Sequence, residues 1–313
     1  MWFEDESNGR LLDRLREALR DGGRVLVFLG AGLSFGSRRS FGRAAFDYER
    51  YDRYPPWEYH GGPFPPLAPD DDGQPLPSWP WLINRMWHEL TAMAPSHEHT
   101  SLYRFFREEG PLDCAQLFRQ SVGEANYAAF LRSQFDVGRE PGGLTPSHRA
   151  LVDLDLRVLF TTNYDELIEA AYVEAAKSLR VSVSEEEFIA HRGSRPERHL
   201  IKLHGSIDQL DSVVLTRRDY ARARGERHEM FGHLRHELSD ASFLFVGFSL
   251  SDPNFGLLYD DIRFVYGLNA PPSYTVQGRR DPVKERYLRS MDVNTIWLDG
   301  WNDLPGFLQR LAT

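Results

Sequence analysis

The amino-acid sequence predicts an α/β protein built on a doubly wound, mostly parallel β-sheet. Two observations carry this prediction. Apolar runs with the length of buried strands alternate with segments of helical periodicity. Several of these runs end directly in a polar or glycine-containing segment, as strands do at the ligand-binding edge of a parallel sheet. Helices are expected on both faces of such a sheet.

The composition excludes several classes of function. A net charge of -9 disfavours a broad nucleic-acid surface, because phosphate binding needs an excess of Lys and Arg. With Cys114 as the single cysteine, neither an intrachain disulfide nor a thiolate zinc cage can form, which fits a reducing compartment. The chain shows neither the pattern of a signal peptide nor an apolar stretch that could span a bilayer. We expect a cytoplasmic protein without direct contacts to nucleic acid or membrane.

The first expected elements are a helix and a strand. Leucines recur with helical spacing from Leu11 to Leu19, and Gly22 and Gly23 end the pattern. The apolar run 25–29 then has the length of a strand that is buried on both faces.

The middle of the chain differs in composition. Residues 36–80 are rich in Arg, Pro, Gly and aromatics without a clean period, which is typical of a surface insertion, or of an ordered lid or protein interface. Residues 81–156 are mainly helical and predict a subdomain inserted into the sheet domain. That sheet domain comprises residues 1–35 and 157–313, and the whole chain, 1–313, is expected to be one domain.

The alternation of strands and helices then resumes and predicts a Rossmann-like sheet. Helices are expected at 165–177, at 253–266 and at the end of the chain. The expected strands are 157–160, 200–203, 213–215, 243–246, 273–276 and 294–298.

The first strand ends in a possible phosphate cradle, Gly30-Ala31-Gly32-Leu33-Ser34. Glycines there let the backbone turn tightly and approach a pyrophosphate. The segment is not a dehydrogenase fingerprint, because Phe35 stands where the third glycine belongs and no acidic residue ends a strand some twenty residues on. A simple strand-to-helix turn is the alternative.

Two further segments place polar side chains at strand ends. In Thr161-Thr162-Asn163-Tyr164-Asp165, the side chains of Asn163 and Asp165 suit either a ligand or the capping of the next helix. In Lys202-Leu203-His204-Gly205-Ser206, the histidine suits a general base near neutral pH, although a lone histidine is more often structural.

The last segment, 246–255, follows a buried strand and opens a helix. Asp252 is a suitable helix cap and Pro253 a suitable first helical residue. Gly247 and Ser249 could contact a ribose or phosphate, or could belong to an ordinary capped turn.

Together these segments resemble the sirtuin superfamily, and more closely its bacterial sirtuin-like NAD-hydrolase branch. Each is short, but they occur in the family's order at strand ends across most of the chain. The matching segments are 30–34, 76–79, 161–165, 202–206 and 246–249.

The resemblance implies that NAD, as the substrate, lies across the carboxyl edge of the sheet. Asn163 would orient the nicotinamide ribose and a water, and His204 would be the base. Residues implied to bind NAD are Gly30, Ala31, Gly32 and Ser34 at the phosphates, Thr161 and Asp165 in the polar pocket, and Gly247 and Ser249 at the adenosine ribose.

Two features in which the sequence departs from the deacylating sirtuins disfavour removal of acyl groups from lysine and favour NAD hydrolysis. The four-cysteine zinc module of the deacylases cannot exist with one cysteine, and their Gly-Ile-Pro-Asp-Phe-Arg stretch is missing. No metal is therefore expected. Cleavage of the nicotinamide–ribose bond passes through an oxocarbenium-like state, so the enzyme must stabilise charge on the sugar and admit a nucleophile.

The resemblance also implies a role as an antiphage-defence effector that depletes NAD when activated. Because unrestrained NAD hydrolysis is toxic, we expect gating by self-assembly into a homo-oligomer or by a separate partner, such as a HerA-type ATPase or an Argonaute. The insertion 36–80 is the candidate contact surface.

Three alternatives compete with this prediction. Gly32-Leu33-Ser34-Phe35-Gly36 fits a nucleophile elbow, and Ser34, Asp165 and His204 follow the order of a serine hydrolase. A non-catalytic NAD- or nucleotide-sensing module would need the same pocket. A zinc site at the pair His228 and His233 is disfavoured, because their spacing has one residue too many for the helical motif.

Overall fold

A computed structural model of the chain describes residues 1–20, 24–34, 37, 76–77, 79–137, 143–194, 196–250, 252–278 and 280–312. Its centre is a seven-stranded sheet in the order β3-β4-β2-β1-β5-β6-β7, and every strand pair is parallel. The strands are β1 Val25–Leu29, β2 Val158–Thr161, β3 Arg180–Ser182, β4 His199–Lys202, β5 Ser242–Val246, β6 Ser273–Gln277 and β7 Val293–Trp297. The predicted doubly wound, Rossmann-like sheet is confirmed.

Helices connect these strands, and none in the described ranges has the length and apolar character needed to cross a lipid bilayer. The helices are α1 Glu6–Arg20, α3 Trp79–Met93, α4 His99–Glu108, α5 Pro111–Val122, α6 Glu124–Phe135, α7 Pro146–Asp153, α8 Leu167–Glu174, α9 Glu185–Ser194, α10 Arg217–Glu226, α11 His228–Asp240, α12 Pro253–Tyr266, α13 Pro282–Ser290 and α14 Leu304–Ala312.

The two faces of the sheet carry separate cores, because successive side chains of a strand point to opposite faces. In β1, Val25, Val27 and Leu29 face the core that α1, α7, α8 and α14 cover. Leu26 and Phe28 face the other core, under α9, α11, α12 and α13. A strand covered on both faces must be apolar throughout, which explains the continuous run of β1.

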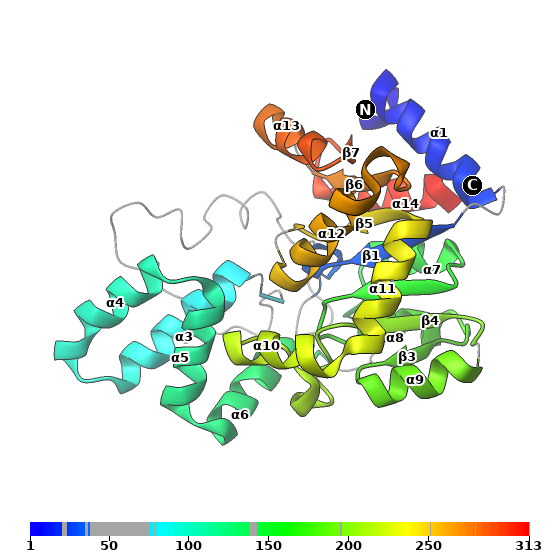
Figure 1. Ribbon diagram of the computed structural model, residues 1–313. Coiled ribbons are helices and arrows are strands. Elements are labelled where there is room, and N and C mark those ends of the chain that lie inside the picture. The colour runs from blue at the N-terminus through cyan, green and yellow to red at the C-terminus, as the bar shows by residue number, and fades with distance from the viewer. Residues whose placement is uncertain are drawn as a thin grey trace.

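The helices α3, α4, α5 and α6 project to one side of the sheet, whereas α7 packs on α8 and α14 (Figure 1). The two ends of the described chain lie together, with α1 against α14 (Figure 1). The Arg16 guanidinium there donates to the carbonyl of Arg310 at 2.7 Å. The insertion 36–80 falls almost wholly outside the described residues.

Three details of the prediction are wrong. Residues 213–215 form no strand, but a buried extended segment whose Val214 N–H donates to the His204 carbonyl at 3.0 Å. The short edge strand β3 was not predicted, because its three residues carry no continuous apolar run. The predicted helix 165–177 begins later and ends earlier, at Leu167 and Glu174.

Candidate functional site

The glycine loop after β1 is shaped by close contact with the loop after β5. These strands are neighbours at the point where the strand order reverses, which is where open α/β sheets bind ligands. A Cβ at Gly30 would lie 2.5 Å from the Gly247 carbonyl oxygen, and one at Gly32 would lie 2.6 Å from Gly247 Cα. Gly247 itself has φ +63. The glycines therefore allow two backbones to touch, and the Gly32 N–H donates to the Gly247 carbonyl at 2.9 Å.

Residues Ala31–Leu33 of the glycine loop form a single 3-10 turn that ends at Ser34. The residues that would form a helix after this turn lie outside the described ranges. Of the implied phosphate contacts, Ser34 is nearly enclosed at 2% exposure, and its hydroxyl already has partners within the protein.

Ser34 joins the glycine loop to the loop after β2. The Asn163 side-chain amide donates to Ser34 Oγ at 3.2 Å, and the Ser34 hydroxyl bonds to the Asp165 carboxyl. Burial raises the pKa of Asp165, while nearby Lys202 opposes that rise. Asp165 Oδ1 also accepts the Leu167 N–H at 3.1 Å at the start of α8, which agrees with the predicted role at the helix start. Thr161 Oγ1 accepts the Asn163 N–H at 3.0 Å and fixes the backbone.

His148 completes this cluster and was missed by sequence reasoning. Its Nε2 lies 3.4 Å from Ser34 Oγ, and its Nδ1 accepts the backbone N–H of Thr145 at 3.3 Å. Because Nδ1 is an acceptor, the hydrogen-bond network assigns the proton to Nε2, which then donates to Ser34. Burial lowers the pKa of His148 to about 3, so the ring is neutral. The sequence does contain a pattern that could have located His148. Thr145-Pro146-Ser147-His148 has the N-cap and first-turn proline of a helix start, but the prediction treated these residues only as part of a helical region.

This donor direction contradicts a serine nucleophile. Ser34 accepts from both His148 and Asn163, so the histidine beside it cannot take its proton. His204, the base in that alternative, instead contacts Asp252 and Tyr220.

The network leaves one atom of Asn163 available. With its side-chain nitrogen committed to Ser34, its Oδ1 is buried and has no hydrogen-bond partner among the described residues. A buried carbonyl oxygen without a partner costs free energy unless a ligand or water supplies a donor. The ribose hydroxyls of a nucleotide, or a water, are donors that fit this requirement.

His204 lies two residues after the end of β4, beside an acidic residue from a distant loop. Its Nε2 is 3.3 Å from Asp252 Oδ2, and the Tyr220 hydroxyl donates to the same oxygen at 2.6 Å. Burial lowers the pKa of His204, and Arg227 adds to that, whereas Asp252 raises it. A carboxylate beside Nε2 favours the proton on that nitrogen and leaves Nδ1 as the basic one. Only 3% of His204 is exposed, so the ring is enclosed by the protein.

The turn after His204 depends on glycine. Gly205 has φ +77, and a Cβ there would collide with the Ser212 backbone. The Arg227 guanidinium reaches the same region, donating to the Leu203 carbonyl and to the Ser212 carbonyl. Among the other implied binding residues, Thr161 is fully buried, Ala31 is exposed in the 3-10 turn, and Ser249 is exposed in the loop after β5.

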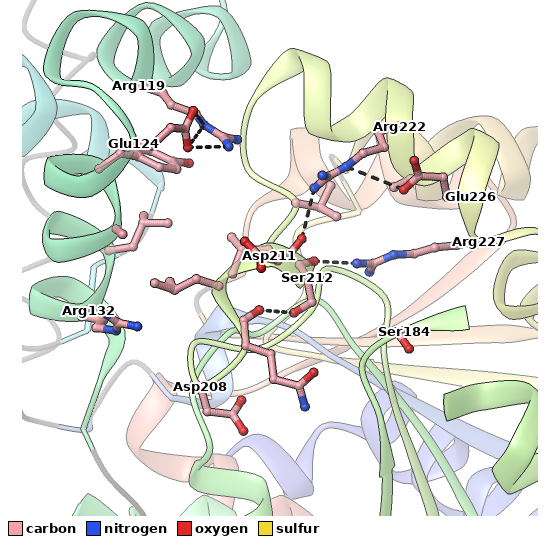
Figure 2. A pocket seen from close by; sticks show the side chains of 18 of the residues that line it. Arg119, Glu124, Arg132, Ser184, Asp208, Asp211, Ser212, Arg222, Glu226 and Arg227 are labelled. Atoms are coloured by element: carbon pink, nitrogen blue, oxygen red, sulfur yellow. Dashed lines mark hydrogen bonds and ion pairs between the residues drawn. The ribbon is translucent and has the colours of Figure 1, made fainter. Parts of the chain in front are cut away.

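A cavity of about 860 Å³ lies beside the His204 loop rather than over the glycine loop. Figure 2 shows its wall, where side chains of α5, α6 and α10 face the segment carrying Asp211 and Ser212. Ser212 Oγ accepts the Ser206 N–H at 3.0 Å, so this wall is bonded to the turn that follows His204. Two of its arginines are paired with nearby acids, Arg119 with Glu124 and Arg222 with Glu226.

The described residues contain no group of three or more His, Cys, Asp or Glu side chains placed to hold a metal ion. His233, part of the disfavoured zinc pair, instead lies 3.7 Å from Glu237 on the same helix.

The sheet and the loops at its carboxyl edge define a class of protein. Residues 157–296 match the model of the SIR2-like domain family, which confirms the resemblance to sirtuin-like proteins over this region. The match includes the segments that carry Asn163, His204 and Asp252, but not the glycine loop.

Particular relatives can then be named. The chain is 35% identical over 150 residues to NAD(+) hydrolase ThsA of Enterococcus faecium, which covers 48% of this chain and 31% of that protein. ThsA of Acinetobacter baumannii (strain 532279) is 26% identical over 66% of this chain and 46% of its own length. Defense-associated sirtuin 2 of Bacillus subtilis is 26% identical over 60% of this chain and 18% of its own length. The chain thus spans less than half of each relative.

Proposed function

We propose that this chain hydrolyses NAD at the nicotinamide–ribose bond. The observation that carries the proposal is Asn163, whose buried Oδ1 lacks a partner among the described residues and lies on the loop hydrogen-bonded to the glycine loop. The names of the ThsA relatives, NAD(+) hydrolase, support the same chemistry. In the reaction the bond from C1 of the ribose to the nicotinamide nitrogen breaks, nicotinamide leaves with the electron pair, and an oxygen nucleophile bonds to C1.

Each residue of the site has a defined task in this proposal. Asn163 Oδ1 accepts a hydrogen bond from a ribose hydroxyl or from the attacking water, and it stabilises the positive charge that develops on the sugar. His204 is neutral because its pKa is lowered, and it takes the proton that the nucleophile loses. Asp252 orients the imidazole. The walls around the phosphates and the adenosine ribose are formed by Gly30, Ala31, Gly32, Ser34, Gly247 and Ser249. Thr161 and Asp165 form the polar base of the pocket.

A direct assay tests the proposal. Purified protein is incubated with NAD, and released nicotinamide and the ribosyl product are identified by chromatography and mass spectrometry. We expect nicotinamide release that is abolished in Asn163→Ala and in His204→Ala. The product peak distinguishes ADP-ribose from a cyclised form. The opposite outcome is that calorimetry detects NAD binding but no NAD is consumed, even when the protein is assembled or its partner is present. That result would favour a sensing module and refute the proposed hydrolysis.

We further propose that the activity serves antiphage defence and is gated by assembly. The name of the Bacillus subtilis relative supports the defence context. The gate would be a homo-oligomer or a separate protein, such as a HerA-type ATPase or an Argonaute, that contacts the insertion 36–80. The test compares NAD loss with and without the protein encoded next to this one, and measures mass by light scattering with and without the insertion. If deletion leaves both the mass and partner binding unchanged, the insertion is not the contact surface.

A further inference from the structure

Lys202 is a fully buried charge for which the proposed reaction has no direct use. It ends β4, and only 1% of its surface is exposed. A buried ammonium is costly unless all of its donors are satisfied and its charge is balanced. In this protein its Nζ has three close acceptors, which equals the number of its N–H donors. They are the Asp165 carbonyl at 2.7 Å, Glu169 Oε1 at 2.9 Å and Ser206 Oγ at 2.9 Å.

Two of these acceptors belong to the loops that carry the proposed reacting side chains. The Asp165 carbonyl lies two residues after Asn163, and Ser206 lies two residues after His204. Further bonds hold the same loops together, because the Tyr164 carbonyl accepts the Ile207 N–H at 2.9 Å and the Ser206 hydroxyl at 3.4 Å. The third acceptor, Glu169, lies on α8 and balances the charge.

We propose that Lys202 is a positioning residue that sets the Asn163 loop against the His204 loop. This inference rests on the proposed NAD hydrolysis for its kinetic consequence, but not for its structural one. The ammonium touches neither side chain. It fixes two backbone segments, so its loss changes the relative placement of Asn163 and His204, and misplacement by a fraction of an ångström is enough to slow a reaction.

Two substitutions at one ion pair separate positioning from stability. Lys202→Met removes the charge and also the bonds to the Asp165 carbonyl and Ser206. Glu169→Gln removes the opposite charge of the same pair but leaves an acceptor for the ammonium and both loop contacts. Both variants break a buried pair, so the melting temperature falls in each. We expect Lys202→Met to lower kcat by about tenfold or more with KM changed less than about threefold. Glu169→Gln retains at least about one third of kcat on the same argument.

Amide hydrogen exchange gives a readout that is independent of catalysis. In Lys202→Met, exchange should become faster in 161–167 and 203–207 while the β6 and β7 amides keep their protection. Unchanged exchange in both loops would overturn the positioning role, as would an equal loss of kcat in both variants. If wild-type protein does not hydrolyse NAD, the exchange result still decides the role of Lys202, and the failure belongs to the proposed function.

If Lys202→Met does not fold, a double variant tests the same proposal. Lys202→Met combined with Glu169→Leu removes both charges together, so a buried apolar contact replaces the ion pair and no unpaired carboxylate remains. We expect this variant to fold, to show the faster loop exchange and to keep the low kcat. Recovery of both wild-type kcat and wild-type exchange would refute the proposal.

Discussion

His204 and Asp252 face each other across the carboxyl edge of the sheet, with Nε2 of the imidazole 3.3 Å from Oδ2 of the carboxyl. His204 follows β4 on one side of the strand-order reversal, whereas Asp252 follows β5 on the other. The Asp252 carboxyl also accepts the Phe255 N–H at 2.9 Å as the cap of α12. One residue therefore starts a helix and orients the proposed base.

Asp252→Asn separates these two tasks, because asparagine still caps a helix but carries no charge. Asp252 raises the pKa of His204, so its removal lowers that pKa further below the ordinary 6.5. The acid limb of the kcat/KM profile should therefore move to lower pH, and kcat should fall by about a hundredfold because the imidazole loses its orientation. The pH–rate profile for NAD hydrolysis checks both effects. An acid limb that moves to higher pH would contradict the assignment of His204 as the base.

Gly247→Ala should disrupt the contact between the two loops. The alanine Cβ would meet Leu33 N and the Gly32 backbone, at a residue that has φ +63. We expect a loss of about 1–3 kcal/mol in unfolding free energy together with weaker NAD binding. Denaturant titration and calorimetry measure the two effects.

Gly256→Ala in α12 is the matched control. A Cβ at this helical position meets nothing within 4 Å, so alanine should raise the unfolding free energy by about 0.5–1 kcal/mol through helix propensity. NAD binding should stay at the wild-type level. Equal destabilisation by both substitutions would show that the contact between the loops has no special importance.

Ser34→Ala tests whether the serine orients Asn163 or attacks a substrate. Loss of the hydroxyl removes the acceptor for the Asn163 amide, so the rate of NAD hydrolysis should fall by about tenfold and not vanish. A fluorophosphonate probe should leave Ser34 unlabelled in wild-type protein. Covalent labelling of Ser34, with complete loss of activity in the variant, would restore the serine-hydrolase alternative.

His148→Gln should reduce the sensitivity of the fold to acid. The pKa of His148 is lowered from 6.5 to about 3 in the folded chain, so the unfolded chain binds a proton that the folded chain does not. The free energy of unfolding therefore falls as pH drops below 6.5 toward 3, by up to about 1.4 kcal/mol per pH unit for such a group. Denaturant titrations at pH 7 and pH 5 should show a smaller difference for the variant. An unchanged difference would contradict the neutral, buried state of His148.

The sheet could be predicted from the sequence because its central strands are apolar on both faces. The run 25–29 is β1 to the residue, and the strands around Phe160 and Phe245 follow the same logic. The prediction was wrong for residues 213–215, because three buried apolar residues occur in a buried loop as readily as in a strand. Local composition does not distinguish the two when the segment is so short.

The candidate site could be predicted only where its residues follow strands. Asn163 and His204 were found in this way, and Asp252 was found as a helix cap. The pairing of His148 with Ser34 spans 114 residues of sequence and depends on how α7 packs, so no local pattern contains it. Lys202 was visible in its motif, but its partners on the loop after β2 became evident only once β2 and β4 were paired.

The contact of Gly30 and Gly32 with Gly247 has a consequence for the protein during its synthesis. The glycine loop is made early, but the surface that supports it and the carboxyl that orients His204 both follow β5. A nascent chain that has emerged from the ribosome only as far as α11 lacks both. The site can therefore be completed only after residues 247 and 252 have left the exit tunnel and β5 has docked beside β1. A nascent chain that ends before this point would lack the proposed activity even with Asn163 and His204 already synthesised.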